Sequence, residues 1–126
     1  MSTKEISALL VDDEPDVRLL LRKMIEAEND GLVVAGEAAD GHEALDAMDR
    51  LNPSVIVIDE RMPAMSGMEA AAIIIARRPG QPIVLCTAHL DDDLRQRATA
   101  IGIAECVAKR EMATIPLLLK DLARTA

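Results

Sequence analysis

The stretch Asn52-Pro53-Ser54-Val55-Ile56-Val57-Ile58-Asp59 decides the fold of this chain. Residues 55–58 are β-branched and apolar without interruption, and a carboxylate follows at once. A run without polar alternation is typical of a strand buried on both faces, as in the middle of a parallel sheet. The preceding Asn52-Pro53 ends any helix before it. Asp59 therefore lies at the carboxyl end of a central strand, which is where open α/β sheets bind ligands.

Length and composition limit the function classes. The 126 residues suffice for one domain with its own core, and we expect residues 1–126 to form a single domain. Half of the residues are hydrophobic but Phe, Tyr and Trp are absent, so the core consists of Leu, Ile, Val, Ala and Met. The net charge of -8 disfavours direct binding of nucleic acid, which needs clustered Lys and Arg, and it permits a metal cation.

Cysteine usage and the N-terminus favour a cytoplasmic protein. Cys86 and Cys106 lie in apolar stretches typical of strands, and we interpret them as small core residues rather than a disulfide framework. The opening Met1-Ser2-Thr3-Lys4-Glu5 is not a signal peptide, and no apolar run approaches the length of a membrane span. We therefore expect no association with a membrane.

Strand and helix patterns alternate along the chain. The strands are predicted at residues 7–11, 32–35, 55–59, 83–87 and 105–109. Helical spacing of apolar residues predicts helices around 17–25, at 41–51, 66–78 and 91–102, and from about 114 onward with Pro116 in the first turn. This alternation predicts an α/β fold, a doubly wound five-stranded parallel sheet of strand order 2-1-3-4-5 with helices on both faces.

The predicted strand order places Asp12 and Asp13, after the first strand, beside Asp59 after the third. Two unit charges about 4 Å apart repel by on the order of 4 kcal/mol at an effective dielectric of about 20. Mg²⁺ is the cation that best offsets this repulsion, because it takes one or two carboxylates plus water and phosphate oxygens. Lys109 supplies a positive charge and Thr87 a hydroxyl at the same edge. Together these groups favour phosphoryl transfer to a nucleophilic carboxylate.

Each of these residues alone has a commoner explanation. Acids after a strand are usually turn or capping residues, a Thr there usually bonds backbone, and a single Lys is usually solvated. Only the joint pattern is specific, with an acid pair after the first strand, an acid after the third, Thr after the fourth and Lys after the fifth.

Several short motifs carry a resemblance to a known family. They are Leu10-Val11-Asp12-Asp13-Glu14, Asp59-Glu60-Arg61-Met62-Pro63, Met65-Ser66-Gly67, Thr87-Ala88 and Lys109. With them the sequence resembles the receiver domain of bacterial two-component response regulators over almost its whole length. The resemblance implies that Asp59 accepts a phosphoryl group from a histidine kinase, a phosphotransfer protein or a small phosphodonor. It further implies a phosphorylation-controlled interaction switch with a downstream protein target, and it allows a homodimer.

The resemblance also assigns roles around Asp59. It implies that Asp13 binds Mg²⁺ directly, that Asp12 binds it mainly through water, and that Asp59 and the backbone carbonyl of Arg61 are further ligands. Thr87 and Lys109 would hold phosphoryl oxygens, and the small Ala88 would leave room for the donor. Such a domain is not an enzyme beyond catalysing its own phosphorylation and dephosphorylation.

Three features depart from the family pattern. Arg110 follows the lysine where the family usually has Pro, often after a cis bond, and a branch with a helix-turn-helix output shares this departure. Cys106 stands where the family has its switch aromatic residue, and no ring exists elsewhere in the chain. The sequence ends at Ala126 without an output domain, as in a stand-alone receiver or one cut at its C-terminus. We therefore expect the signal to be carried by residues 87–93 and the start of the fourth predicted helix, with small changes around Cys106.

Two other classes of function stay open. An aspartate-based phosphatase also uses a strand-end Asp, but it needs a second Asp two residues on, where this chain has Arg61. A receiver-shaped interaction module without phosphate turnover is favoured by Cys106 and disfavoured by the complete acidic pocket. Arg61 and His89 flank the site and are placed to tune the lifetime of a phosphorylated state by steering water.

Overall fold

The computed structural model describes residues 5–125; residues 1–4, on which the prediction about a signal peptide partly rests, and Ala126 lie outside this range. The strands of the described range are β1 Ile6–Val11, β2 Leu32–Ala38, β3 Val55–Ile58, β4 Ile83–Thr87 and β5 Glu105–Ala108. The α-helices are α1 Pro15–Glu28, α2 Gly41–Leu51, α3 Gly67–Arg77, α4 Asp92–Ile101 and α5 Ile115–Thr125, and a 3-10 segment, Lys109–Thr114, precedes the last one.

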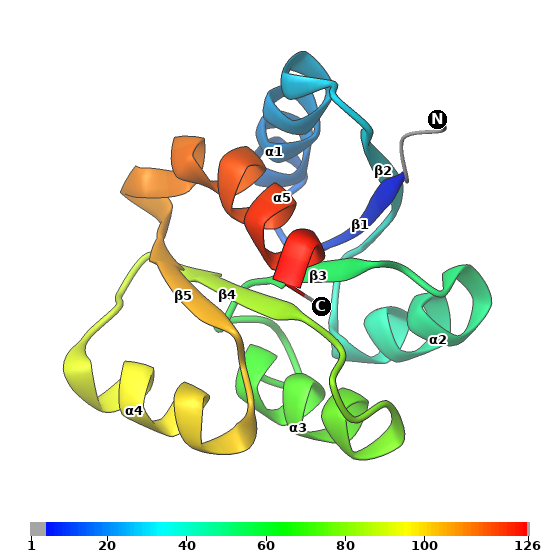
Figure 1. Ribbon diagram of the computed structural model, residues 1–126. Helices are drawn as coiled ribbons and strands as arrows, with labels where there is room; N and C mark the ends of the chain where they lie inside the picture. Colours follow the sequence, from blue (N-terminus) through cyan, green and yellow to red (C-terminus); the bar gives the residue numbers. More distant parts are fainter. Residues whose placement is uncertain (1–4, 126) are drawn as a thin grey trace.

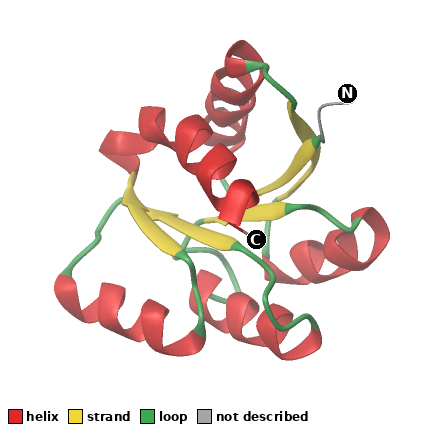
Figure 2. Ribbon diagram, in the orientation of Figure 1, coloured by secondary structure: helices red, strands yellow, loops and turns green. Residues whose placement is uncertain are grey.

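The strands form one parallel sheet in the order β2-β1-β3-β4-β5, which confirms the predicted fold. Helices α1 and α5 cover one face and α2, α3 and α4 cover the other (Figure 1). Figure 2 shows the resulting three layers, with the strands between two layers of helices. Strand β1 lies between β2 and β3, so the strand order reverses there and opens a crevice at the carboxyl ends of β1 and β3.

Strand β3 separates two apolar clusters, and its side chains alternate between them. Ile56 and Ile58 pack with α2, α3 and α4, whereas Val55 and Val57 pack with α1 and α5. None of the four is more than 1% exposed. Burying each such side chain contributes roughly 1.5–3 kcal/mol, so the strand before Asp59 is firmly fixed in place. The clusters contain aliphatic side chains, Met and Cys, and no ring.

The structure differs from the predicted boundaries at β2 and β5. Strand β2 continues to Ala38, because a shift in register opposite Ala8 and Leu9 lets it keep pairing with β1 beyond the predicted end. A Cβ on Gly36 would lie 2.6 Å from Leu51 Cδ1, so a larger residue there would require the Leu51 side chain to shift. Strand β5 ends at Ala108, so Lys109 begins the 3-10 segment instead of ending the strand. Helix α5 begins at Ile115, which places Pro116 in its first turn as predicted.

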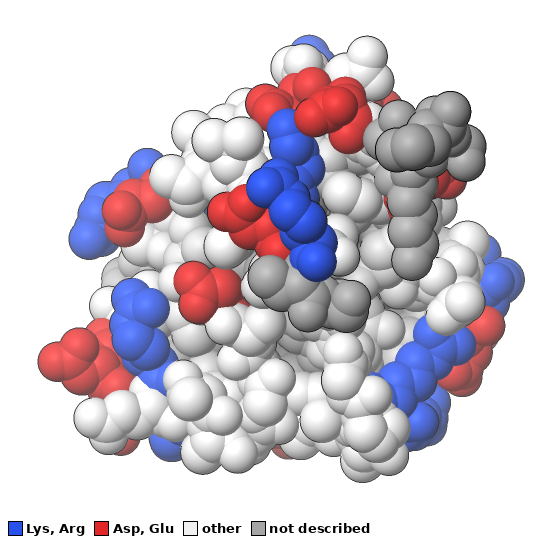
Figure 3. Space-filling view, in the orientation of Figure 1, with Lys and Arg blue, Asp and Glu red and all other residues white. Residues whose placement is uncertain are grey.

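Surface features agree with the composition. No helix in the described residues has the length and apolar character needed to cross a membrane. On the face shown in Figure 3, Lys and Arg side chains lie in small groups beside Asp and Glu, and no continuous basic area is visible there. The two cysteines are free thiols, with Cys86 buried and Cys106 partly buried.

Candidate functional site

Polar side chains gather where the strands end. Asp12 follows β1, Asp59 follows β3, Thr87 ends β4 and Lys109 follows β5. The sheet continues into the two acids, because the Asp59 amide donates to the Val11 carbonyl at 2.9 Å and the Asp12 amide donates to the Ala38 carbonyl at 3.1 Å. Asp12, Asp59 and Thr87 are the buried polar residues of the described part of the chain, with exposures of 2%, 4% and 1%.

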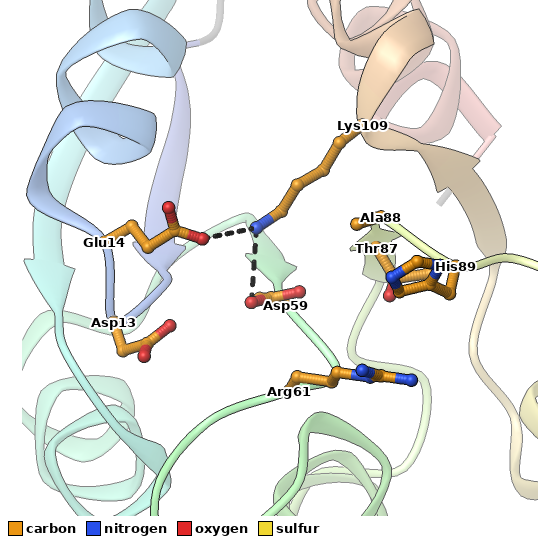
Figure 4. A pocket seen from close by; sticks show the side chains of 8 residues that line it. All are labelled: Asp13, Glu14, Asp59, Arg61, Thr87, Ala88, His89 and Lys109. Atoms are coloured by element: carbon orange, nitrogen blue, oxygen red, sulfur yellow. Dashed lines mark hydrogen bonds and ion pairs between the residues drawn. The ribbon is translucent and has the colours of Figure 1, made fainter.

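Lys109 joins the ends of three segments. Its Nζ lies 3.1 Å from Asp12 Oδ2, 3.3 Å from Asp59 Oδ2 and 3.5 Å from Glu14 Oε1. Figure 4 shows the lysine crossing the hollow from the β5 side to reach Asp59 and Glu14. The sequence predicted that Lys109 would reach this edge, but it did not single out Glu14 as a partner.

The electrostatics of the site depend on burial and on an excess of carboxylates. Burial, and then the charge of Asp12, raise the pKa of Asp59 above its ordinary value, although Lys109 acts in the opposite direction. Burial alone would lower the pKa of Lys109, but its hydrogen bonds and charge interactions with Asp12 and Asp59 outweigh burial and raise it. Lys109 therefore stays cationic at neutral pH, and one lysine does not fully offset the acids around it.

The turn after β1 gathers carboxylate oxygens. Asp12, Asp13 and Glu14 each offer an oxygen within 4.8 Å of the others. The Glu14 amide donates to Asp12 Oδ1 at 2.9 Å, which orients the buried carboxylate. Asp13 and Glu14 are exposed, and both line the hollow beside Asp59. A donor set made of carboxylate oxygens with surplus negative charge suits a hard divalent cation such as Mg²⁺.

The loop after Asp59 is held closely against the strand. A Cβ on Gly67 would lie 2.2 Å from the carbonyl oxygen of Asp59, so only glycine allows this approach of α3. The Gly67 amide donates to the Glu60 carbonyl at 2.9 Å, and the Met68 amide donates to Glu60 Oε1 at 2.8 Å. Ser66 and Glu69 form a reciprocal capping box at the helix start. These contacts fix the backbone below Asp59.

These elements enclose a hollow of about 240 Å³. It is lined by Asp13, Glu14, Asp59, Arg61, Thr87, Ala88, His89 and Lys109. The structure therefore brings together every residue that the sequence singled out for the site, with Asp12 buried directly behind it. Two groups were missed. Glu14 contacts Lys109, and Arg18 contacts the Asp12 carbonyl. The only signal for Arg18 was its spacing of four residues from Arg22 on α1.

Neither cysteine lines this hollow. Burial raises the pKa of Cys86 to about 12, and burial also raises the pKa of Cys106. Thiols with raised pKa values are poor nucleophiles at neutral pH. Cys106 instead lines a second hollow between α4, β5 and α5, together with Leu117. All described peptide bonds are trans, including Lys109–Arg110, where the family usually has its proline.

A sequence model of the response regulator receiver domain matches residues 8–119 of this chain. The chain belongs to this family.

Curated relatives of this receiver domain cover different shares of it. Protein CcdB of Bacillus subtilis is 32% identical over 101 residues, which are 80% of this chain and 82% of that protein. A protein-glutamate methylesterase/protein-glutamine glutaminase of Geobacter metallireducens is 43% identical over 86 residues, 68% of this chain but 24% of that protein. The uncharacterized transcriptional regulatory protein YxjL of Bacillus subtilis is 40% identical over all 126 residues, which span 56% of its length.

Solved structures agree with this assignment. The signal receiver domain of the putative response regulator NarL from Mycobacterium tuberculosis superimposes with a TM-score of 0.89 at 27% identity, over 98% of this chain and 99% of that one. A LuxR-family two-component response regulator from Aurantimonas sp. gives a TM-score of 0.91 at 28% identity, over 97% and 87% of the chains. The predicted resemblance is thus confirmed, and membership in this family does not favour a phosphatase or a scaffold without phosphate chemistry.

Proposed function

We propose that this receiver domain accepts a phosphoryl group on Asp59, with Mg²⁺ held by Asp12, Asp13, Asp59 and the backbone carbonyl of Arg61. The observation that carries the proposal is the setting of the Asp59 carboxylate. It is 4% exposed, lies at the base of an open hollow, and has a lysine nitrogen at 3.3 Å. A buried carboxylate with a raised pKa in a pocket is a common sign of a functional group.

The phosphodonor is the only co-reactant that the transfer consumes. An Asp59 carboxylate oxygen attacks the phosphorus atom, a new O–P bond forms, and the bond from phosphorus to the leaving oxygen breaks. With acetyl phosphate the leaving group is acetate, which departs with the bonding electron pair. Lys109 offers a permanent positive charge to the phosphoryl oxygens, Thr87 offers a hydroxyl donor, and Ala88 leaves space for the donor. Bound Mg²⁺ would supply further neutralisation of negative charge.

The partners of this chemistry are also proposals. Histidine kinases and phosphotransfer proteins are the donors that the family implies, and the receiver would report to a downstream protein in the cytoplasm. The excess of acidic residues supports a protein partner rather than nucleic acid for this part of the chain. The chain spans about a quarter of the methylesterase and about half of the regulatory protein, so the activities of those whole proteins are not transferred.

The test is intact-mass spectrometry after incubation with acetyl phosphate and Mg²⁺. We expect one added phosphoryl group on the unaltered chain and none on Asp59→Asn. Asp30→Asn is the matched control, because Asp30 also contacts a lysine but lies outside the hollow. Full modification of Asp59→Asn would contradict the assignment, and an unmodified wild-type chain would support a pure interaction module. Continuous release of phosphate from supplied esters would instead indicate a phosphatase.

A further inference from the structure

Three charged residues outside the hollow, Arg18, Arg22 and Glu37, form a connected cluster. The cluster adjoins residues 12–14, which we call the acid turn. Arg18 Nε, on α1, donates to Glu37 Oε1, on β2, at 2.9 Å. Arg22, one helical turn further along α1, contacts the other oxygen, Glu37 Oε2, at 2.8 Å. Glu37 thus receives both arginines and ties α1 to the end of β2. The two arginines differ in what each contacts beyond Glu37.

Arg18 reaches the acid turn itself. Its Nη1 donates to the backbone carbonyl of Asp12 at 2.5 Å, and its side chain is only 17% exposed. Arg22 instead contacts Glu26, one turn along its own helix, at 3.5 Å. Arg18 therefore connects Glu37 to the acid turn, whereas Arg22 connects Glu37 only to the surface of α1.

The carbonyl that Arg18 holds belongs to the peptide unit between Asp12 and Asp13. Peptide units are planar, so fixing this carbonyl also fixes the direction in which the chain enters Asp13. The other groups of Asp12 are already held, its amide by Ala38 and its carboxylate by Lys109. Asp13 is exposed and lines the hollow. The hydrogen bond from Arg18 to the Asp12 carbonyl holds the peptide unit that leads into it.

Glu37 is well suited to hold Arg18 in this position. Partial burial would raise the pKa of Glu37, but the hydrogen bonds from Arg22 and Arg18 outweigh it and lower the pKa. Glu37 is therefore ionised at neutral pH. A guanidinium donates in a rigid planar fork, so the contact with Glu37 restricts the direction of the remaining nitrogens. One of those nitrogens is the donor to Asp12.

We propose that Arg18, oriented by Glu37, is a positioning residue that fixes the Asp12–Asp13 peptide so that Asp13 faces a metal in the hollow. The inference rests on the proposed Mg²⁺ site and adds a determinant of its affinity. A positioning role and a simple effect of charge predict opposite changes in Mg²⁺ affinity when Arg18 is replaced. Deleting a cation near an acid cluster should tighten binding of Mg²⁺ if only charge matters. Loss of a positioning contact should weaken it.

Calorimetric titration with Mg²⁺ separates these effects. Arg18→Met and Arg18→Lys should both raise the dissociation constant about tenfold, the usual effect of removing a group that orients a metal ligand. Lysine keeps the charge but lacks the planar fork, whose separate nitrogens donate in fixed directions to Glu37 and to the Asp12 carbonyl. Arg22→Met is the matched control, since it deletes a cation from the same carboxylate without touching Asp12. It should change the constant less than about twofold.

The dependence of phosphorylation by acetyl phosphate on Mg²⁺ concentration is a second measurement. At saturating Mg²⁺ the Arg18 variants should reach the wild-type level, with only the half-saturating concentration raised. A lowered plateau would contradict a positioning role, as would wild-type affinity in Arg18→Lys or equal weakening in Arg22→Met.

A measurement without metal tests the same contact independently. In Arg18→Met, hydrogen exchange at the amides of Asp13 and Glu14 should be faster than in wild type and in Arg22→Met. Unchanged exchange at these amides would overturn the inference. If the wild-type chain binds no Mg²⁺ but the exchange effect is present, the proposed metal site is wrong. Arg18 would then still orient the Asp12–Asp13 peptide, but with no effect on a metal.

Discussion

Two lysines of this receiver domain each contact several carboxylates, but the pKa values of their aspartate partners shift in opposite directions. Lys109 lies between Asp12, Asp59 and Glu14, and Lys120 of α5 lies 2.9 Å from Asp30 and 3.0 Å from Glu28. Their side chains are almost equally accessible, at 18% and 16%. Their carboxylate partners are not alike, because the side chain of Asp59 is 5% exposed and that of Asp30 is 68% exposed.

The difference shows what turns a charged cluster into a site. Hydrogen bonding and the charge of Lys120 lower the pKa of Asp30, as in an ordinary ion pair at the surface. Burial and the charge of Asp12 raise the pKa of Asp59, in spite of its lysine. A lysine at contact distance therefore lowers the pKa of the exposed carboxyl, but it does not overcome the effect of burial on the buried one. Burial of the acids, rather than the presence of a lysine, distinguishes the strand-end cluster from the surface cluster.

The largest contrast is expected from deleting each lysine. Lys109→Met leaves two buried acids without their cation and should lower the free energy of unfolding by about 3 kcal/mol at neutral pH without Mg²⁺. Lys120→Met removes a cation from acids that water solvates, and the loss should be much smaller. Urea denaturation of both variants measures the difference. Equal losses would mean that burial of the acids does not distinguish the two clusters.

Addition of Mg²⁺ should affect only the strand-end cluster. At a hundred times its dissociation constant, Mg²⁺ should stabilise the wild-type fold by about 2.7 kcal/mol. Asp13→Asn should lose most of this gain and should be more stable than wild type without the metal, because one repelling charge is gone. Asp30→Asn should keep the full gain. Thermal unfolding with and without Mg²⁺ provides the comparison, and a melting temperature indifferent to Mg²⁺ would argue against a metal site.

The two clusters should respond to pH in opposite directions. The raised pKa of Asp59 means that the folded state binds its proton more tightly, so wild type gains stability relative to Asp59→Asn as pH falls from neutrality toward the ordinary value of 3.8. The lowered pKa of Asp30 gives stability that is present above 3.8 and is lost below it. Urea titrations of both Asn variants from neutral pH to below 3.8 test the signs. Parallel pH profiles for the two variants would refute the contrast.

The smallest effects are expected where no cluster lies, around Cys106. A switch shifts a partner's affinity only as far as its two states differ, and a cysteine offers little difference in either position. With a beryllofluoride phosphoryl mimic, hydrogen exchange should change most in residues 87–93 and little in β5 and α5. Cys106→Tyr should spread the change to β5. An equally strong response of β5 and α5 in the wild-type chain would show that Cys106 suffices.

The strand-end residues were predictable because burial patterns locate strand ends. Once the run ending at Asp59 and the alternation along the chain are recognised, the strand order follows and places Asp12 beside Asp59. The contacts of long side chains were not predictable in the same way. The reach of Lys109 to Glu14 depends on rotamers and on where β5 stops, and the contact between Arg18 and Glu37 depends on β2 continuing past Gly36. Both are set by tertiary packing.

The core clusters on the two faces of the sheet, packed without a ring, have an optical consequence. A chain without Phe, Tyr or Trp contributes almost nothing to near-ultraviolet absorbance and has no intrinsic fluorescence. A single tryptophan introduced at Cys106 would therefore be the only fluorophore of the molecule. Its emission would report on the space between α4, β5 and α5 without labelling and without any background from the chain itself.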